Sequence, residues 1–205
     1  MKTIRTFCAL LIGVVGVARP ACADWLLTGY VAQLFNVKTS QSTELNLPAE
    51  KFDNSLGFGF NLASAFPGRG NLGFEFDWAW QQKALRTSDV FGTTFASRLM
   101  TLNTNFFYSP ATPHARPYFS LGPTFEYRTD DSLARFVTPS GWGVGLNAGA
   151  GVMAFATQRL GVRLDGRYYR NFGEFYDLRT DVLQRRSGWN NLQFLRAFFG
   201  LTVVL

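Results

Sequence analysis

Two carboxylates whose spacing could support acid–base chemistry lie in the segment L-G-F-E-F-D-W-A-W-Q-Q-K, residues 72–83. Glu75 and Asp77 are two residues apart, so on a β-strand both side chains point to the same face. A glycosidase needs its two carboxylic acids on either side of the bond that it cleaves. Neighbours on one strand face do not fit that arrangement, and arginines elsewhere in the chain could neutralise both groups. The sequence therefore favours a buried salt-bridge network over a catalytic pair.

The other motifs that could indicate catalysis or cofactor binding are weak. His114 is the only histidine and lies in the predicted turn P-A-T-P-H-A-R-P, which excludes a multi-histidine metal site and a histidine-based nucleophile relay. The segment W-G-V-G-L-N-A-G-A-G, residues 142–151, does not match the dinucleotide motif G-x-G-x-x-G, and no predicted helix follows it. No metal, cofactor or catalytic residue is expected, and we interpret these glycines as making room inside a narrow barrel.

Alternating apolar and polar residues indicate β-strands with two different faces. In residues 72–83, for example, one face is apolar throughout, and the other carries Glu75, Asp77 and Lys83. The pattern predicts eight strands: Trp25–Asn36, Asn54–Phe66, Leu72–Lys83, Ala96–Tyr108, Arg116–Arg128, Trp142–Phe155, Leu160–Asn171 and Asn191–Leu205. We therefore predict an all-β fold, an eight-stranded antiparallel up-and-down β-barrel.

The first 23 residues have the features of a secretory signal peptide: a basic start, an apolar stretch at Phe7–Val17 and the small-residue cleavage site Ala21-Cys22-Ala23. A lipoprotein anchor on Cys22 is the alternative, but Arg19 and Pro20 stand where a lipobox has Leu and a small residue. We predict a cleaved signal peptide over residues 1–23 and one barrel domain over residues 24–205. Cleavage removes Lys2, Arg5 and Arg19 and lowers the formal charge from +6 to +3, which is too small to indicate a nucleic-acid partner.

The lengths of the connections favour a membrane barrel over a soluble one. Alternation alone also fits a soluble lipocalin-like barrel, which has its apolar face inside. The predicted connections alternate strictly between long ones, residues 37–53, 83–95, 129–141 and 171–190, and short ones, residues 67–71, 109–115 and 156–159. Outer-membrane barrels have longer extracellular loops and short periplasmic turns. The sequence therefore predicts a transmembrane barrel whose first strand rises from the periplasm, with the soluble barrel as the alternative.

Aromatic residues on the apolar faces fall at two heights in this arrangement, as in the girdles of membrane barrels. Ordinary strand aromatics are the alternative, because Phe74, Phe76 and Trp78 lie between the two heights. The predicted outer girdle comprises Trp80, Tyr127, Trp142 and Tyr168, and the inner one Trp25, Phe66, Tyr108 and Phe119.

Several motifs resemble the OmpA-like group of small outer-membrane β-barrels, which includes opacity-type and OmpW-type porins. They are R-P-Y at residues 116–118 leading into Gly122, R-L-D-G-R-Y at residues 163–168 and the closing G-L-T-V-V-L at residues 200–205. The resemblance implies a barrel in the outer membrane of a Gram-negative bacterium, in contact with lipid and lipopolysaccharide and inserted by the β-barrel assembly machinery. The chain departs from the family in having Leu205 where the last strand usually ends with Phe, and we expect no peptidoglycan-binding domain after the barrel.

Charged residues on the polar faces are predicted to meet inside the barrel. Strands three and seven lie opposite each other in an eight-stranded ring, and the interior of such a ring is only wide enough for side chains to fill. Paired charges in that space would form a plug, since unpaired ions there would be costly. The predicted network has one layer formed by Glu75, Asp77, Arg163, Asp165 and Arg167 and a second layer, nearer the outer surface, formed by Glu126, Arg128 and Arg196.

These patterns predict a non-enzymatic integral outer-membrane protein with a surface-exposed, structural or porin-like role and a largely plugged lumen. One alternative is an OmpW-like channel for small apolar solutes. The other is a lipid A-modifying barrel enzyme, because the segment G-F-E-F-D-W resembles a strand of lipid A 3-O-deacylases. That family carries a His-x-Ser-Asn element on its penultimate strand, where this chain has R-Y-Y-R-N at residues 167–171, so the catalytic residues cannot be carried over.

Overall fold

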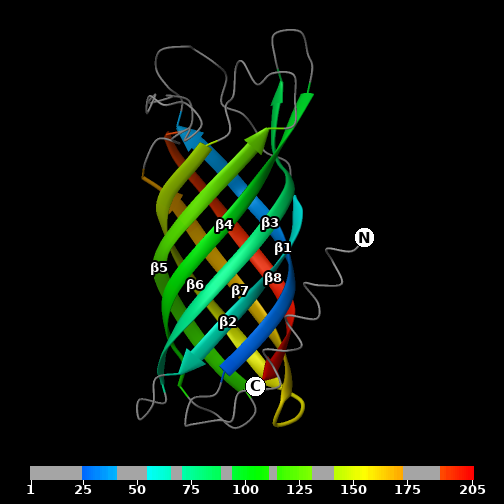
Figure 1. Cartoon of the computed structure of the whole chain (residues 1–205), viewed down its shortest axis with the longest axis vertical. Coiled ribbons are helices and arrows are strands. Elements are labelled where there is room, and N and C mark those ends of the chain that lie inside the picture. The colour runs from blue at the N-terminus through cyan, green and yellow to red at the C-terminus, as the bar shows by residue number, and fades with distance from the viewer. Residues whose placement is uncertain are drawn as a thin grey trace, which may run out of the picture.

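A closed barrel of eight antiparallel strands forms the protein, with each strand paired to its neighbour in sequence and β8 paired back to β1 (Figure 1). The computed structural model describes residues 25–40, 55–65, 71–88, 94–110, 115–130, 141–172 and 190–205. The strands are β1 (Trp25–Ser40), β2 (Leu56–Ala65), β3 (Leu72–Ser88), β4 (Thr94–Tyr108), β5 (Ala115–Asp130), β6 (Gly141–Phe155), β7 (Leu160–Asn171) and β8 (Asn190–Val204). The predicted all-β fold and the closed barrel are thus confirmed. The predicted signal peptide lies outside the described residues.

The two ends of the barrel differ in the connections that they carry. Residues 41–54, 89–93, 131–140 and 173–189 connect strands at one end, which we call the loop end. Residues 66–70, 111–114 and 156–159 connect strands at the other, which we call the turn end. No helix in the described part of the chain is long and apolar enough to cross a membrane.

The connection between β3 and β4 differs from the prediction. A long loop was expected over residues 83–95, but β3 continues to Ser88 and β4 begins at Thr94. The two strands stay paired there, with Thr87 opposite Phe95, beyond an irregularity between Gln81 and Leu85. In Figure 1 this hairpin rises above the neighbouring strands at the loop end.

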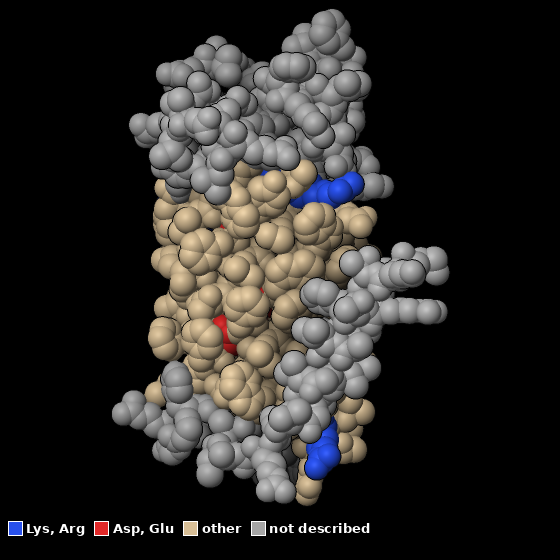
Figure 2. All heavy atoms as spheres, in the orientation of Figure 1, with Lys and Arg blue, Asp and Glu red and all other residues tan. Residues whose placement is uncertain are grey.

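Side chains alternate between the lumen and the outer surface, and the apolar ones are outside. Phe58, Phe106 and Leu201 are 52%, 66% and 58% exposed, whereas Asn61 and Asp77 on the opposite faces are fully buried. Figure 2 shows one side of this outer surface, with Lys and Arg visible only near its two ends. A soluble barrel would have the reverse arrangement. The soluble alternative is therefore wrong.

Aromatic residues lie toward both ends of this outer surface. Tyr108 and Phe119 are exposed and directly paired near the turn end. Toward the loop end, the rings of Tyr127 and Trp142 are 4.7 Å apart between centroids. Of the other predicted girdle residues, Trp25 and Tyr168 are exposed, Trp80 is half-buried, and Phe66 lies outside the described residues.

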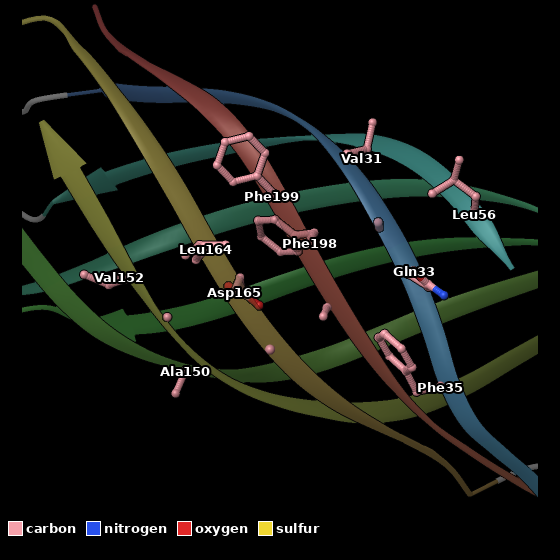
Figure 3. Close-up of a pocket in the computed structure, with 14 residues that line it drawn as sticks. Val31, Gln33, Phe35, Leu56, Ala150, Val152, Leu164, Asp165, Phe198 and Phe199 are labelled. Carbon is pink, nitrogen blue, oxygen red and sulfur yellow. The ribbon is translucent and has the colours of Figure 1, made fainter. Parts of the chain in front are cut away.

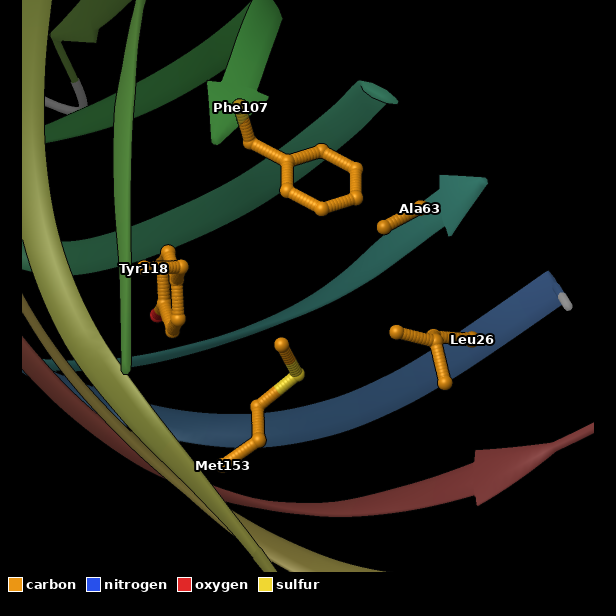
Figure 4. Close-up of a cluster of buried hydrophobic side chains, with 5 residues drawn as sticks. All are labelled: Leu26, Ala63, Phe107, Tyr118 and Met153. Carbon is orange, nitrogen blue, oxygen red and sulfur yellow. The ribbon is translucent and has the colours of Figure 1, made fainter. Parts of the chain in front are cut away.

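A cluster of apolar side chains fills the lumen near the turn end (Figure 4). It is contributed by strands from around the barrel, and the partly buried Phe155 and Val204 pack against it. Its buried members are Leu26, Ala63, Phe107, Tyr118 and Met153. We call this group the turn-end cluster.

Pro123 is accommodated in β5 by an interruption in one of its two ladders. Pairing with β4 runs as far as Thr124 opposite Asn103 and resumes at Leu121 opposite Phe106. The missing N–H of proline therefore falls where the ladder is already broken. On its other side β5 pairs continuously with β6, including Pro123 opposite Leu146.

Candidate functional site in the barrel lumen

Glu75 on β3 binds two arginines that reach it from β7 on the opposite side of the barrel. Its Oε2 lies 2.6 Å from Nη2 of Arg163, and its Oε1 lies 2.7 Å from Nη2 of Arg167. Asn105 on the neighbouring strand β4 also donates a hydrogen bond to Oε1 at 2.8 Å. Because β3 and β7 are opposite each other in the ring, these contacts cross the lumen and occupy its axis.

Asp165 lies between the two arginines of its own strand. Arg167 donates to both carboxylate oxygens, from Nε to Oδ1 and from Nη2 to Oδ2, each at 2.9 Å. Nη2 of Arg163 is 3.4 Å from Oδ2. Tyr118 on β5 also donates its hydroxyl hydrogen to Oδ2 and accepts a hydrogen bond of 2.7 Å from Nε of Arg163. The two contacts of Arg167 form a bidentate pairing of its guanidinium with both oxygens of the Asp165 carboxylate. Bidentate pairs are among the strongest arginine–carboxylate interactions.

Asp77 extends the network to Arg196, and this position corrects the prediction for that residue. Nη2 of Arg196 forms an ion pair with Oδ1 of Asp77, and its Nη1 donates to Oγ1 of Thr101 at 2.9 Å. Tyr30 and Asn103 donate further hydrogen bonds to Asp77, at 2.7 and 2.6 Å. Arg196 was expected in the outer layer, but it belongs to the central one. Counting residues from strand ends ignores the stagger that strand tilt imposes between neighbours.

Aromatic rings cover the guanidinium groups. The ring of Tyr30 stacks on Phe198 with centroids 4.1 Å apart, and Arg163 lies 4.4 Å from the ring centroid of Tyr118. Arg196 lies 4.9 Å from the centroid of Tyr169. The sequence pattern was not used to assign these aromatic residues to the lumen network, although the alternation contained the signal. Tyr30, for example, lies between the outward Gly29 and Val31.

Two glycines of β6 provide the space that these long side chains occupy. A Cβ atom on Gly149 would lie 2.5 Å from Cγ of Arg167. A Cβ atom on Gly151 would overlap the ring of Tyr118. Any larger residue at either position would displace a side chain of the network.

The residues predicted for the second layer lie toward the loop end. Glu126 is fully buried, and Arg128, two residues further along β5, is 3% exposed. Nδ2 of Asn171 donates a hydrogen bond of 3.1 Å to Oε2 of Glu126. The structure therefore places Glu126 and Arg128 apart from the central network, which consists of Glu75, Asp77, Arg163, Asp165, Arg167 and Arg196.

Solved structures of small bacterial outer-membrane proteins are similar to this barrel. Neisserial surface protein A matches with a TM-score of 0.57 and 14% identity over 89% of this chain and 99% of that one. OprG of Pseudomonas aeruginosa matches with a TM-score of 0.57 and 12% identity over 90% and 96%. Ail of Yersinia pestis, solved with the heparin analogue sucrose octasulfate, matches with a TM-score of 0.55 and 11% identity over 89% and 99%. The chain has the fold of the small outer-membrane β-barrels. No protein-family model matches it, and no curated protein sequence is significantly similar to it.

The central network of this outer-membrane-type barrel is balanced in charge and closed to solvent. Its three arginines and three carboxylates are each at most 5% exposed. Ions buried to this degree are tolerated only when partners of opposite charge are close by. Glu75 and Asp77 are engaged by guanidiniums and by asparagine amides, so neither carboxylate is free to act as an acid or a base. Among the described residues, no group of His, Cys, Asp and Glu side chains is suited to hold a metal ion.

An apolar groove of about 500 Å³ lies on the outer wall across β1, β2, β6, β7 and β8 (Figure 3). The exposed side chains of Val31, Val152 and Phe199 line it. It crosses the small outward residues Gly166 and Ala197, which are paired on β7 and β8. Its outward side chains carry no ionisable group, so the groove fits an apolar chain better than a polar substrate.

Proposed function

We propose that this protein is a non-enzymatic integral outer-membrane protein, whose barrel anchors its surface loops and whose lumen is closed. The apolar outer surface supports a lipid environment, since a closed barrel with alternating faces is one of the two structures that can span a bilayer. The similarity in fold to small bacterial outer-membrane barrels supports the outer membrane of a Gram-negative bacterium as the location. Export by the predicted signal peptide fits the same location.

The proposed orientation places the loop end outside the cell and the turn end in the periplasm. Short turns face the periplasm in barrels of this kind, and longer loops face outward. The partners in this arrangement are membrane lipid, lipopolysaccharide at the outer leaflet and the β-barrel assembly machinery during insertion. The surface role then belongs to the loop-end connections, and the barrel holds them at the membrane.

The observation that carries the proposed closure is that paired ions join opposite walls of the barrel. The Glu75 carboxylate is held by Arg163 and Arg167 across the axis, and the turn-end cluster fills the lumen below this contact. A solute moving through the barrel would have to break charge-assisted hydrogen bonds and then displace buried apolar side chains. Both layers oppose flow in either direction.

The two alternative functions fit the lumen less well. A channel for apolar solutes needs an apolar path, whereas the middle of this lumen is lined by ions, amides and hydroxyls. The apolar groove lies on the outer wall and is separate from the lumen. A lipid-modifying enzyme needs a nucleophile with a base or a metal, and Glu75 and Asp77 are held in ion pairs. Incubation of the protein with lipopolysaccharide tests this point: we expect no released acyl chains, and their release would contradict the proposal.

Single-channel conductance in planar bilayers tests the closed lumen. We expect the wild-type conductance to be far below that of a general porin. Arg163→Ala should raise it, because the substitution removes donors to Glu75, Asn61 and Tyr118 at once. Arg170→Ala is a matched control on the same strand, since Arg170 is exposed on the outer face, and it should leave the conductance unchanged. A wild-type conductance as large as a porin's, unaffected by Arg163→Ala, would contradict the plug.

A further inference from the structure

Glu126 differs from the other buried carboxylates of the lumen. Glu75, Asp77 and Asp165 each bind at least one arginine. Glu126 is fully buried, yet its contact in the structure is the single hydrogen bond that Asn171 donates to Oε2. Among the described residues, its Oε1 has no hydrogen-bond partner. A buried carboxylate with one neutral partner is costly unless a further group approaches it.

Another buried polar atom without a hydrogen-bond partner lies on the same inward face of β5. Oγ1 of Thr124, two residues from Glu126, has no hydrogen-bond partner among the described residues. Native structures leave few such atoms unsatisfied, and an ion or a water molecule commonly explains a group of them.

The guanidiniums of the central network do not neutralise Glu126. Arg196 directs its donors to Asp77 and to Thr101, the residue paired with Glu126 across β4 and β5. Arg163 and Arg167 are bound to Glu75 and Asp165. The network is therefore balanced without Glu126, whose negative charge remains for another partner.

We propose that Glu126 and Thr124 form a binding site for one small monovalent cation, either an alkali ion or a primary ammonium group. Glu126 Oε1 and Thr124 Oγ1, which lie two residues apart on the same inward face of β5, are the acceptors that this cation would use. A single carboxylate matches a single positive charge. A divalent ion would require more carboxylate ligands than the described residues offer here. The site depends on the proposed function in one respect: the central network closes the turn-end side of the site and prevents a cation from entering from that end.

Thermal unfolding of the whole barrel in detergent micelles tests the proposal. Chlorides of potassium, methylammonium and N-methyl-D-glucamine, which is too large for the site, are compared at equal ionic strength. A cation that binds only the folded state stabilises it by RT ln(1 + [L]/Kd), so the unfolding temperature rises as the cation concentration exceeds Kd. We expect potassium or methylammonium to raise it above the value in N-methyl-D-glucamine, and the ion that acts at the lower concentration identifies the preferred class. Glu126→Gln should abolish this difference.

Nuclear magnetic resonance shows where the cation binds, and it still tests the proposal if the Glu126→Gln variant does not fold. Titration of the effective cation should shift the side-chain amide signal of Asn171 and the backbone signal of Thr124 saturably, and Thr124→Val should weaken the response. Ser120→Ala is the matched control and should leave the response unchanged, because Ser120 is another buried hydroxyl of β5 without a partner. Equal unfolding temperatures in all salts, or shifts that miss Asn171 and Thr124, would show that Glu126 is only hydrated or protonated and would overturn the site. These results are independent of the conductance measurement, so failure of the site and failure of the plug can be told apart.

Discussion

At the scale of residues, the lumen network fixes the shape of the barrel interior more than it adds stability. A buried ion pair often stabilises a protein no more than well-packed apolar residues would. Removal of one partner is different, because it leaves an unpaired buried charge. Arg163 illustrates this, since it contacts Glu75, Asn61 and Tyr118, which lie on three other strands. The network thereby joins walls that the strand ladders do not connect directly.

Substitution of Trp78 tests whether the outer surface of the barrel faces lipid. It points outward near the middle of the barrel wall and packs against Phe60, with ring centroids 5.6 Å apart. Trp78→Arg should lower the free energy of unfolding by about 2–4 kcal/mol, the range for a cation at the bilayer midplane. The measurement is urea unfolding of the barrel in lipid vesicles.

Tyr108→Arg and Trp78→Leu are the controls for this prediction. Tyr108 is exposed near the turn end, where a cation should cost about 0–1 kcal/mol because it reaches the interface. Trp78→Leu keeps the position apolar and separates the loss of the ring from the burial of a charge. Equal losses for the two arginine variants would mean that the outer surface has no depth-dependent lipid environment.

Sequence reasoning predicted the face of each lumen residue but not all of its partners. Alternation alone places Glu75 and Arg163 inward, and the order of strands in the ring brings them across the axis. The partner of Arg196 depends on stagger, which alternation does not encode. Arg196 is paired in register with Arg167, and two like charges side by side on neighbouring strands are unfavourable. Asp77, across the lumen on β3, offsets this repulsion by pairing with Arg196. That balance could be read only from the structure.

At the scale of elements, the sequence located strands accurately where the outward face is apolar and the inward face is polar. The predicted bounds of β7 match the structure, and the turn-end limits of β3 and β4 match as well. The misjudged limits lie mainly at the loop end. There β3 continues past the predicted Lys83 to Ser88, and β1 continues past the predicted Asn36 to Ser40. Beyond the membrane neither face has to be apolar, so alternation disappears while hydrogen bonding between strands continues. The irregularity after Gln81 marks this transition.

The last strand should be indispensable for assembly. Residues Phe199–Val203 pair with both β1 and β7, so their loss would expose unpaired backbone groups of two strands to lipid. Deletion of residues 199–205 should therefore abolish accumulation in the outer membrane. Cell fractionation followed by comparison of boiled and unboiled samples on a gel measures this, because folded outer-membrane barrels usually migrate differently.

Leu205→Phe is the control for that deletion. It keeps every pair of β8 and restores the terminal residue common in OmpA-like barrels, so it should accumulate at least as well as the wild type. Normal amounts of a heat-modifiable truncated protein would show that closure by β8 is not required.

At the scale of the whole molecule, closure of the ring and closure of the lumen depend on each other. Eight strands leave an interior that side chains can fill, and this chain fills it with the turn-end cluster and the central network. In the proposed membrane arrangement, the outer surface faces lipid and the loop-end connections are available for contacts outside the membrane. The direction in which the barrel is inserted decides whether those connections face the cell surface.

Trypsin digestion of intact cells tests that direction. The loop-end connections contain Lys51 and Arg179, and the turn-end connection between β2 and β3 contains Arg69. With the loop end outside, trypsin should cut after Lys51 or Arg179 in intact cells, because extracellular loops are open to added protease. Arg69 should become accessible only after the outer membrane is permeabilised, so fragments that end there serve as the internal control. Cleavage after Arg69 in intact cells, with Lys51 and Arg179 protected until the membrane is opened, would reverse the proposed orientation and move the surface role to the turn end.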